Sequence, residues 1–301
     1  MKVRKSSFML FLVIILSVFL HSEVINAQFG TFSSEELIEY TKEWTGERFP
    51  DGRPKVPDRI LELMKEVSIT EAWTILSKYG YDYQHEFMTN EWINLHPDRA
   101  FVGRAFTGFF MPHRPDVDKI TREKGKAAGI KGDINSWVID PLVENDCMVI
   151  DIYGRVDGGD FMGDNLANAV YAKSKSGAVI DGAVRDMEGI YDIPGFNAFI
   201  RGHDPAVYYG IMLMGINVPV QIGRTIVMPG DVVLGRRDGI IFIPPHLAEA
   251  VVESSIRAGL RDEWGHMRLR EKKYPAGDVD GRWTEEMKKD YEEWEKNRLK
   301  K

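Results

Sequence analysis

The stretch from Gly163 to Glu188 holds the residues that are best suited to chemistry. It begins with a Gly-Asp pair at an expected helix start, continues through a short apolar strand, and closes with Arg185 and Asp186. Twenty residues separate Asp164 from Arg185. A guanidinium grips a carboxylate or a keto oxygen through its planar fork, and a carboxylate is a hard ligand that suits Mg²⁺ or Mn²⁺. The segment therefore predicts a site for a small anion beside a divalent metal.

A glycine-rich loop precedes Asp164, after an expected strand and before an expected helix. In that context free backbone N–H groups and the helix dipole bind an anion. The spacing is neither GxGxxG nor a P-loop, which disfavours a nucleotide and favours a small carboxylate or phosphate. The local pattern alone is explained equally well by a tight turn in which Asp164 only caps its helix.

The adjacent pair Arg185 and Asp186 imposes a geometric condition. Neighbouring residues of a regular strand point to opposite faces of the sheet. Both side chains can serve one site only if the chain leaves the strand at this point, which Gly182 and the loop after Asp186 permit. If nothing else were known, a surface salt bridge would be the simpler interpretation of the pair.

Signatures of several other enzyme classes are absent from the sequence. The seven histidines show neither an HExxH motif nor a two-histidine ligand spacing, and there is no Gly-x-Ser-x-Gly elbow. The single cysteine, Cys147, excludes an intrachain disulfide and cysteine zinc sites. It lies in an apolar run and is expected to be a buried structural thiol. Zinc and serine hydrolases are therefore disfavoured.

The N-terminus predicts export. Three basic residues precede an apolar run over residues 8–20, which has the length of a signal peptide and is short for a membrane span. We expect cleavage after Ala27, with an uncleaved anchor as the alternative. Residues 1–27 carry a net charge of +2 and the whole chain −7, so the mature chain carries −9. This charge disfavours nucleic acid as a partner. A periplasmic or secreted protein without membrane attachment after cleavage is expected.

The elements that must position the chemical residues alternate between short strands and helices. Strands are expected at 100–110, 147–153, 178–180, 218–222, 225–228 and 239–243. Helices are expected at 34–45, from 57, at 70–79, 164–176, 245–260 and 283–298. This alternation predicts an α/β fold class.

The run from Gly163 to Asp186 resembles the RraA-like family, which includes the regulator of ribonuclease activity A and the 4-hydroxy-4-methyl-2-oxoglutarate aldolases. Its aldolase branch is marked by an Asp, twenty residues and an Arg-Asp pair. Two flanking stretches agree with the resemblance, FVGRAFT at 101–107 and the motifs within 227–244. The resemblance covers a core at about 97–265. This core lies between the signal peptide with a helical extension at 28–96 and a C-terminal extension with an amphipathic helix at 266–301.

The resemblance implies a swivelling β/β/α fold, assembled as a homotrimer or homohexamer with the site between subunits. It implies that Asp186 binds Mg²⁺ or Mn²⁺, that Arg185 holds a keto-acid substrate, and that Asp164 orients a water for proton transfer. The backbone N–H groups that it assigns to the substrate carboxylate belong to Gly163, Asp164, Asn165 and Leu166. It also implies a glutamate from the last helix of a neighbouring subunit, for which Glu263 is the nearest match.

Two functions from different classes follow from these residues. The first is a divalent-metal-dependent carbon–carbon lyase, an aldolase or decarboxylase, that cleaves a 4-hydroxy-2-oxo acid or a related keto or sugar acid through a pyruvate-type enolate. The alternative is a non-catalytic binding or regulatory protein that shares only the fold. The chain departs from the family pattern where Glu188 is followed by Gly189, and residues 133–137 match no assigned feature. These departures concern the substrate more than metal binding.

Overall fold

The computed structural model describes residues 32–87, 91–158 and 160–298. The signal peptide expected at residues 1–27 lies outside them. Of the helices that the structure describes, none combines the length and apolar character needed to cross a membrane.

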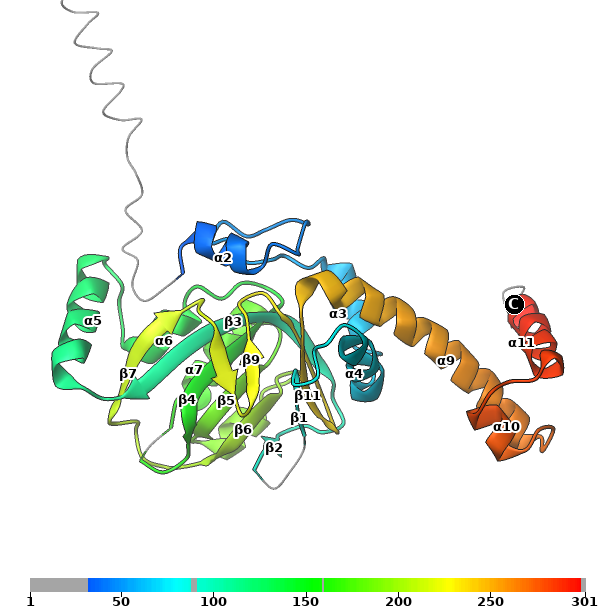
Figure 1. The fold of residues 1–301 in the computed structure, drawn as a ribbon. Helices are drawn as coiled ribbons and strands as arrows, with labels where there is room; N and C mark the ends of the chain where they lie inside the picture. The colour runs from blue at the N-terminus through cyan, green and yellow to red at the C-terminus, as the bar shows by residue number, and fades with distance from the viewer. Residues whose placement is uncertain (1–31, 88–90, 159, 299–301) are drawn as a thin grey trace, which may run out of the picture.

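A mixed sheet forms the centre of the molecule, with strand order β1-β11-β10-β3-β4-β5-β6-β2 and β7 paired to β3 (Figure 1). Its parallel part consists of β3 (Phe101–Pro112), β4 (Asp146–Arg155), β5 (Ala178–Val184) and β6 (Ala198–His203). Its antiparallel strands are β1 (His85–Phe87), β2 (Ile93–Asn94), β7 (Ile211–Ile216), β10 (Val232–Arg236) and β11 (Gly239–Ile243). A separate hairpin of β8 (Val220–Ile222) and β9 (Thr225–Val227) lies over one face.

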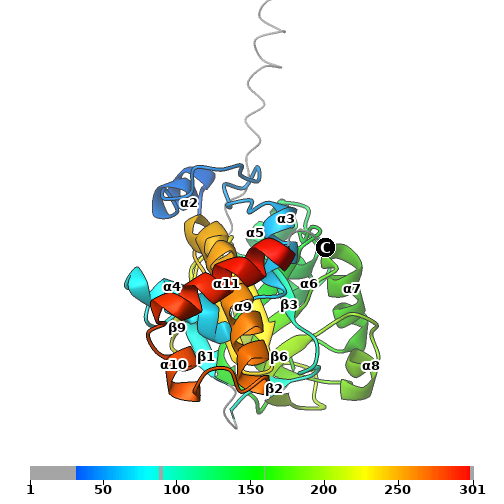
Figure 2. The same cartoon turned by 90° about the vertical axis from the view of Figure 1, so that its right-hand side faces the viewer.

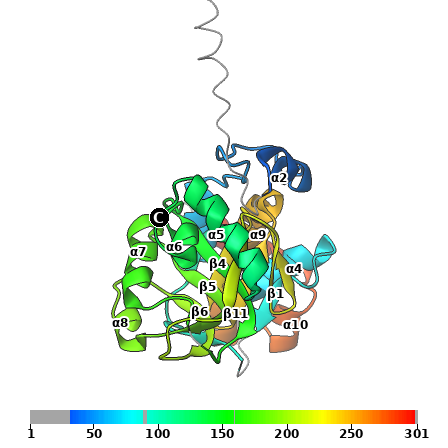
Figure 3. The ribbon, with the colours of Figure 1, turned by 90° about the vertical axis from the view of Figure 1, so that its left-hand side faces the viewer.

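Helices cover one face of the sheet, and the β8–β9 hairpin packs on the opposite face. One apolar cluster joins β4 and β5 to α6 (Ile134–Ile139) and α7 (Asp164–Ser174), and α5 (Pro115–Ala127) lies at the same end (Figure 3). A second cluster joins β10 and β11 to α3 (Asp58–Met64), α4 (Ile69–Lys78) and the first part of α9 (Ala248–Arg270). All seven residues of β5 are buried, as expected for a central strand of a parallel sheet. The predicted α/β class is confirmed.

Most of the predicted elements are present, and the differences have local causes. The strands β6, β7 and β10 were not predicted because each is short and carries a glycine that weakens its pattern, Gly202, Gly215 and Gly235. The unassigned residues 133–137 form the start of α6, where Asp133 is the N-cap and accepts a hydrogen bond from Ile134 N at 2.8 Å. The helix expected at 245–260 is longer: a 3₁₀ turn, η1 (Pro245–Leu247), leads into α9.

The segment before the core contributes strands as well as helices. α2 (Ser34–Tyr40), α3 and α4 are its helices. β1 pairs with β11 and β2 pairs with β6, so both strands lie at opposite ends of the main strand order. This segment therefore completes the sheet that positions the site.

The C-terminal segment packs on the far part of α9, away from the sheet (Figures 1 and 2). It comprises α10 (Ala276–Asp280) and α11 (Glu285–Arg298). Trp264 of α9 is fully buried against Trp283, with ring centroids 4.4 Å apart, and Met287 of α11 is 1% exposed. The predicted apolar face of this terminal helix therefore packs within the chain.

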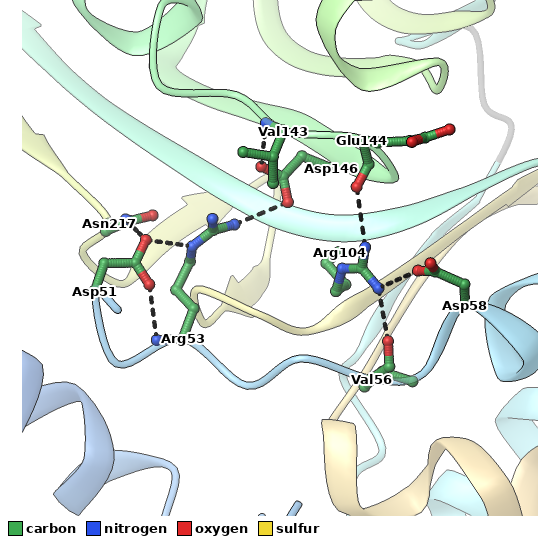
Figure 4. A network of polar contacts seen from close by, with 9 residues as sticks. All are labelled: Asp51, Arg53, Val56, Asp58, Arg104, Val143, Glu144, Asp146 and Asn217. Carbon is green, nitrogen blue, oxygen red and sulfur yellow. Dashed lines mark hydrogen bonds and ion pairs between the residues drawn. The ribbon is translucent and has the colours of Figure 1, made fainter. Parts of the chain in front are cut away.

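A buried network of ion pairs fastens the N-terminal segment to the sheet (Figure 4). Arg53, whose side chain is 3% exposed, contacts Asp146 Oδ1 at 3.0 Å through Nη1 and Asp51 Oδ2 at 2.8 Å through Nε. Beside it, Arg104 donates to Val56 O at 2.6 Å and to Asp58 Oδ1 at 2.8 Å. Burial disfavours the charged form of Arg53, but Asp146 and Asp51 outweigh this effect and raise its pKa.

Removing one partner of a buried ion pair leaves an uncompensated charge, which costs about 3–5 kcal/mol. We therefore expect Arg53→Ala to lower the free energy of unfolding by that amount in urea titrations. The control is Arg59→Ala, because Arg59 forms an exposed pair with Glu249 at 3.5 Å and such pairs contribute about 0–1 kcal/mol. Equal losses in the two variants would contradict the role of the network.

Asp231 is a second buried carboxylate, in the turn between β9 and β10. It is 2% exposed, and its Oδ2 accepts a hydrogen bond from Met228 N at 2.8 Å. Burial raises its pKa to about 7. An unfolded Asp ionises near pH 4, so between about pH 4 and pH 7 the folded state binds more protons than the unfolded state. Asp231 therefore lowers stability progressively as the pH rises through this window.

We expect Asp231→Asn to flatten the dependence of the unfolding free energy on pH between about pH 4 and pH 7, by up to a few kcal/mol across the window. Urea titrations at several pH values measure this dependence. Asp238→Asn, at an exposed turn position nearby, is the control and should leave the slope as in the wild-type protein. An unchanged slope in Asp231→Asn would show that the carboxylate ionises normally in the fold.

Candidate functional site

The end of β5 has the conformation that the Arg-Asp pair requires. β5 ends at Val184, and Asp186 has left-handed backbone angles, φ 54° and ψ 46°. The chain thus leaves the strand before the pair, and the two side chains turn toward one another. Arg185 Nε donates to Asp186 Oδ2 at 3.1 Å, and the exposed fractions of the side chains are 32% and 47%. The geometric condition for one shared site is met.

The glycine-rich loop lies directly beside the end of β5. Phe161 N donates to Ala183 O at 2.8 Å, and Arg185 N donates to Met162 O at 3.1 Å. Gly163 follows in this loop and is buried. A Cβ atom at Gly163 would lie 2.4 Å from Asp186 Oδ2, so only glycine lets the backbone approach this carboxylate so closely.

Asp164 begins α7 and faces α8 (Met187–Tyr191) rather than solvent alone. A Cβ atom at Gly189 would lie 2.8 Å from Asp164 Oδ2, so the carboxylate lies against the backbone of α8. Its Oδ1 accepts a hydrogen bond from Asn165 N at 2.7 Å. The Asn165 N–H, which the resemblance assigned to a substrate carboxylate, is therefore bonded to Asp164 in this structure. Leu166 is half-buried at the next position of the same turn.

The structure adds one residue that the sequence did not single out. Asp160 is 2% exposed, and its Oδ1 lies 3.3 Å from Arg185 Nη1. Burial raises the pKa of Asp160, and the charge of Arg185 opposes that rise. Hydrogen bonding to Asp186, together with the charge of Asp160, raises the pKa of Arg185 against the effect of desolvation. A loop residue has no periodicity, so the sequence carried no signal for this contact.

The donor set suits a hydrated divalent cation with few protein ligands. Within the described ranges, no three or more His, Cys, Asp or Glu side chains gather into a group that could hold a metal. Mg²⁺ requires only one or two carboxylates and keeps several waters. Asp186 offers a half-exposed carboxylate beside the close backbone approach at Gly163. The residues present therefore fit the ion that the resemblance implies.

Glu263 lies elsewhere in the chain. It is on the far part of α9, and its Oε2 contacts Arg298 Nη2 of α11 at 3.1 Å. That part of α9 projects away from α7 and α8 (Figures 1 and 2). The fold of one chain does not bring Glu263 to Arg185, and its arrival from a neighbouring subunit stays a prediction.

We expect Gly163→Ala to displace the Asp186 carboxylate, because a contact of 2.4 Å is far inside the usual separation of about 3.5 Å. A crystal structure of the variant would show the Arg185–Asp186 contact broken or rearranged. Gly259→Ala is the control: its added Cβ meets nothing within 4 Å, and the change should raise helix stability by about 0.5–1 kcal/mol. An unmoved Asp186 in Gly163→Ala would refute the close approach.

The comparisons with known proteins agree on one family. The family model described as RraA-like, Aldolase/RraA, matches residues 68–242. The 4-hydroxy-4-methyl-2-oxoglutarate aldolase of Thermus thermophilus is 32% identical over 95 residues, 30% of this chain and 57% of that protein. A provisionally named 4-hydroxy-4-methyl-2-oxoglutarate aldolase of Halalkalibacterium halodurans is 31% identical over 121 residues, 39% of this chain and 55% of that protein. The chain thus spans little more than half the length of these curated relatives.

The crystal structure of Streptomyces coelicolor RraAS2, described as an unusual member of the RNase ES inhibitor RraA protein family, aligns with a TM-score of 0.57. The alignment covers 72% of this chain and 98% of that one at 23% identity. At this identity the likeness concerns the fold alone, and it agrees with the α/β architecture described above.

Proposed function

The chain belongs to the RraA-like family, and from this premise we propose that it is a divalent-metal-dependent carbon–carbon lyase. The substrate class is a 4-hydroxy-2-oxo acid or a related keto or sugar acid. The observation that supports this proposal is the convergence of Arg185 and Asp186 at the end of β5, 3.1 Å apart and beside the start of α7. The names of the aldolase relatives support the same reaction class.

Each side chain has a chemical task that its surroundings allow. The partly exposed Arg185 can donate hydrogen bonds to the carboxylate or the keto oxygen of the substrate, where negative charge develops on cleavage. Asp186 would hold Mg²⁺ or Mn²⁺, which supplies Lewis-acid polarisation of the keto group when bound. Asp164 would hold a water that takes the proton from the 4-hydroxyl group. As the C4 oxygen becomes the carbonyl oxygen of the released aldehyde or ketone, the C3–C4 bond would break and its electron pair would form the enolate of pyruvate. A proton returned to C3 would complete pyruvate.

Oxaloacetate decarboxylation passes through the same enolate. Loss of carbon dioxide replaces loss of an aldehyde or ketone, and the electron pair again enters the 2-keto group. The same arginine and cation would therefore serve both reactions, so a decarboxylase activity belongs within the proposal.

The second candidate is a binding or regulatory protein that shares only the fold. The family description, Aldolase/RraA, names RraA beside the aldolases, which leaves this candidate open. The Asp164, Arg185 and Asp186 set, which marks the aldolase branch, supports the lyase instead. Saturable binding of keto acids in the presence of Mg²⁺, without turnover of any of them, would select the binding protein.

The setting of the reaction is also part of the proposal. We propose that residues 1–27 direct export, that the mature protein acts in the periplasm or outside the cell, and that it assembles as a homotrimer or homohexamer. The basic and apolar pattern of the N-terminus supports the first two points. Arg185 and Asp186 are 32% and 47% exposed in one chain, which leaves the site open to a neighbouring subunit, as the third point requires.

We expect Asp186→Ala to lower Mg²⁺-dependent release of pyruvate by at least about 100-fold, since its carboxylate is the one placed to hold the cation. Pyruvate is measured in a coupled assay over a panel of 4-hydroxy-2-oxo acids and oxaloacetate. Chelation of the metal in the wild-type protein should produce a similar loss. Glu188→Ala is the control, because this exposed carboxylate lies two residues further along the chain. Equal pyruvate release by wild type and Asp186→Ala would refute the lyase assignment.

A further inference from the structure

Arg185 has two carboxylate partners whose surroundings differ sharply. Asp160 is 2% exposed and lies 3.3 Å from Nη1, whereas Asp186 is 47% exposed and lies 3.1 Å from Nε. The guanidinium therefore spans the distance between a buried carboxylate and one that solvent and ligands can reach. The second Nη group makes no contact with protein among the contacts described for Arg185.

The loop that carries Asp160 is held by contacts from several directions. Arg155 donates to Gly158 O at 2.9 Å through Nη2 and to Tyr209 O at 2.6 Å through Nη1. The Arg155 guanidinium also lies 5.2 Å from the centroid of the Tyr209 ring. These contacts join the loop to the segment after β6.

A second set of contacts fixes the same loop at its other side. Gly158 N donates to Asp204 Oδ2 at 2.9 Å, and Asp160 N donates to Ala206 O at 3.2 Å. Asp160 is thus held by its own N–H on Ala206 O, and the next residue is held by the bond from Phe161 N to Ala183 O at 2.8 Å. A carboxylate fixed in this way can hold a guanidinium fork in one orientation, because it loses little conformational entropy in doing so.

We propose that Asp160 is a positioning residue that holds the Arg185 guanidinium toward the substrate while Asp186 binds the cation. This inference rests on the proposed function of the site. Arg185 and the cation would compete for the Asp186 carboxylate, and Arg185 would lose a partner when the cation binds. Asp160 is too deeply buried to reach the cation, so it can pair with Arg185 whether or not the cation is bound. The two carboxylates would thus have separate roles, Asp186 in binding the cation and Asp160 in holding Arg185. These roles explain why Arg185 has a buried partner.

The test compares Asp160→Asn with Asp157→Asn. Asn keeps the size and one oxygen acceptor of Asp160 but removes its charge, and Asp157 is an exposed carboxylate of the same loop. With Mg²⁺ present, calorimetry measures the affinity for oxalate, an analogue of the pyruvate enolate. We expect Asp160→Asn to weaken oxalate binding and to raise the KM for the keto acid by at least about tenfold, the effect of losing one charge-assisted contact of about 1.4 kcal/mol or more. The affinity for Mn²⁺, which we assign to Asp186, should change by less than about twofold, a smaller effect than the tenfold loss expected for oxalate.

A second measurement does not depend on catalysis. The Nη1–H resonance of Arg185, which belongs to the group that contacts Asp160, can be identified by its absence in the nitrogen-15 spectrum of Arg185→Lys. We expect this resonance to shift and to exchange faster with water in Asp160→Asn, and to be unchanged in Asp157→Asn. Thermal unfolding of both variants checks that a changed affinity does not arise from loss of fold.

The outcomes separate the two proposals. A wild-type protein that neither binds oxalate nor releases pyruvate would remove the proposed lyase function, and the Arg185 resonance alone would then decide the role of Asp160. An unchanged resonance in Asp160→Asn overturns the inference. So does a changed resonance with wild-type oxalate affinity in an active enzyme, because Asp160 would then hold Arg185 without affecting its ligand.

Discussion

The candidate site depends on the short distance between the glycine-rich loop and the end of β5. Two backbone hydrogen bonds set this distance, one from Phe161 N to Ala183 O at 2.8 Å and one from Arg185 N to Met162 O at 3.1 Å. These bonds join the loop to the end of the strand. The Asp160 carboxylate of the loop and the Arg185–Asp186 pair therefore lie together. The absence of side chains at Gly163 and Gly189 then lets two aspartates pack directly against backbone.

The two ends of the parallel strands carry different features. A buried ion pair lies at one end, and the candidate site lies at the other. At the start of β4, Asp146 is paired with Arg53 in a buried network that ties the N-terminal segment to the core. At the other end of the same strand, the chain enters the loop that carries Asp160. Ligands of open α/β sheets bind beyond the carboxyl ends of the parallel strands, where side chains from successive loops converge. The Arg-Asp pair of the candidate site follows the carboxyl end of β5, which is where this rule predicts a ligand.

Arg53 and Arg185 illustrate different uses of one interaction. Arg53 has carboxylates on two sides and its side chain is 3% exposed, so its contacts are all used within the fold. Arg185 also has two carboxylates, but its side chain is 32% exposed and one of its partners faces solvent. An arginine with spare donors at the surface is suited to binding an anion, whereas a fully enclosed one serves stability.

The sequence by itself predicted the α/β class, which the structure confirms, and it singled out Asp164, Arg185 and Asp186 as candidate site residues. Its evidence was the alternation of strand and helix patterns and the spacing of Asp164, Arg185 and Asp186, both of which depend on neighbouring residues along the chain. Tertiary structure alone decided the partners of these residues. Asp160 meets Arg185 across 25 residues and Arg53 meets Asp146 across 93. Such pairs depend on how loops close around the sheet, and loop closure leaves no periodic pattern in the sequence.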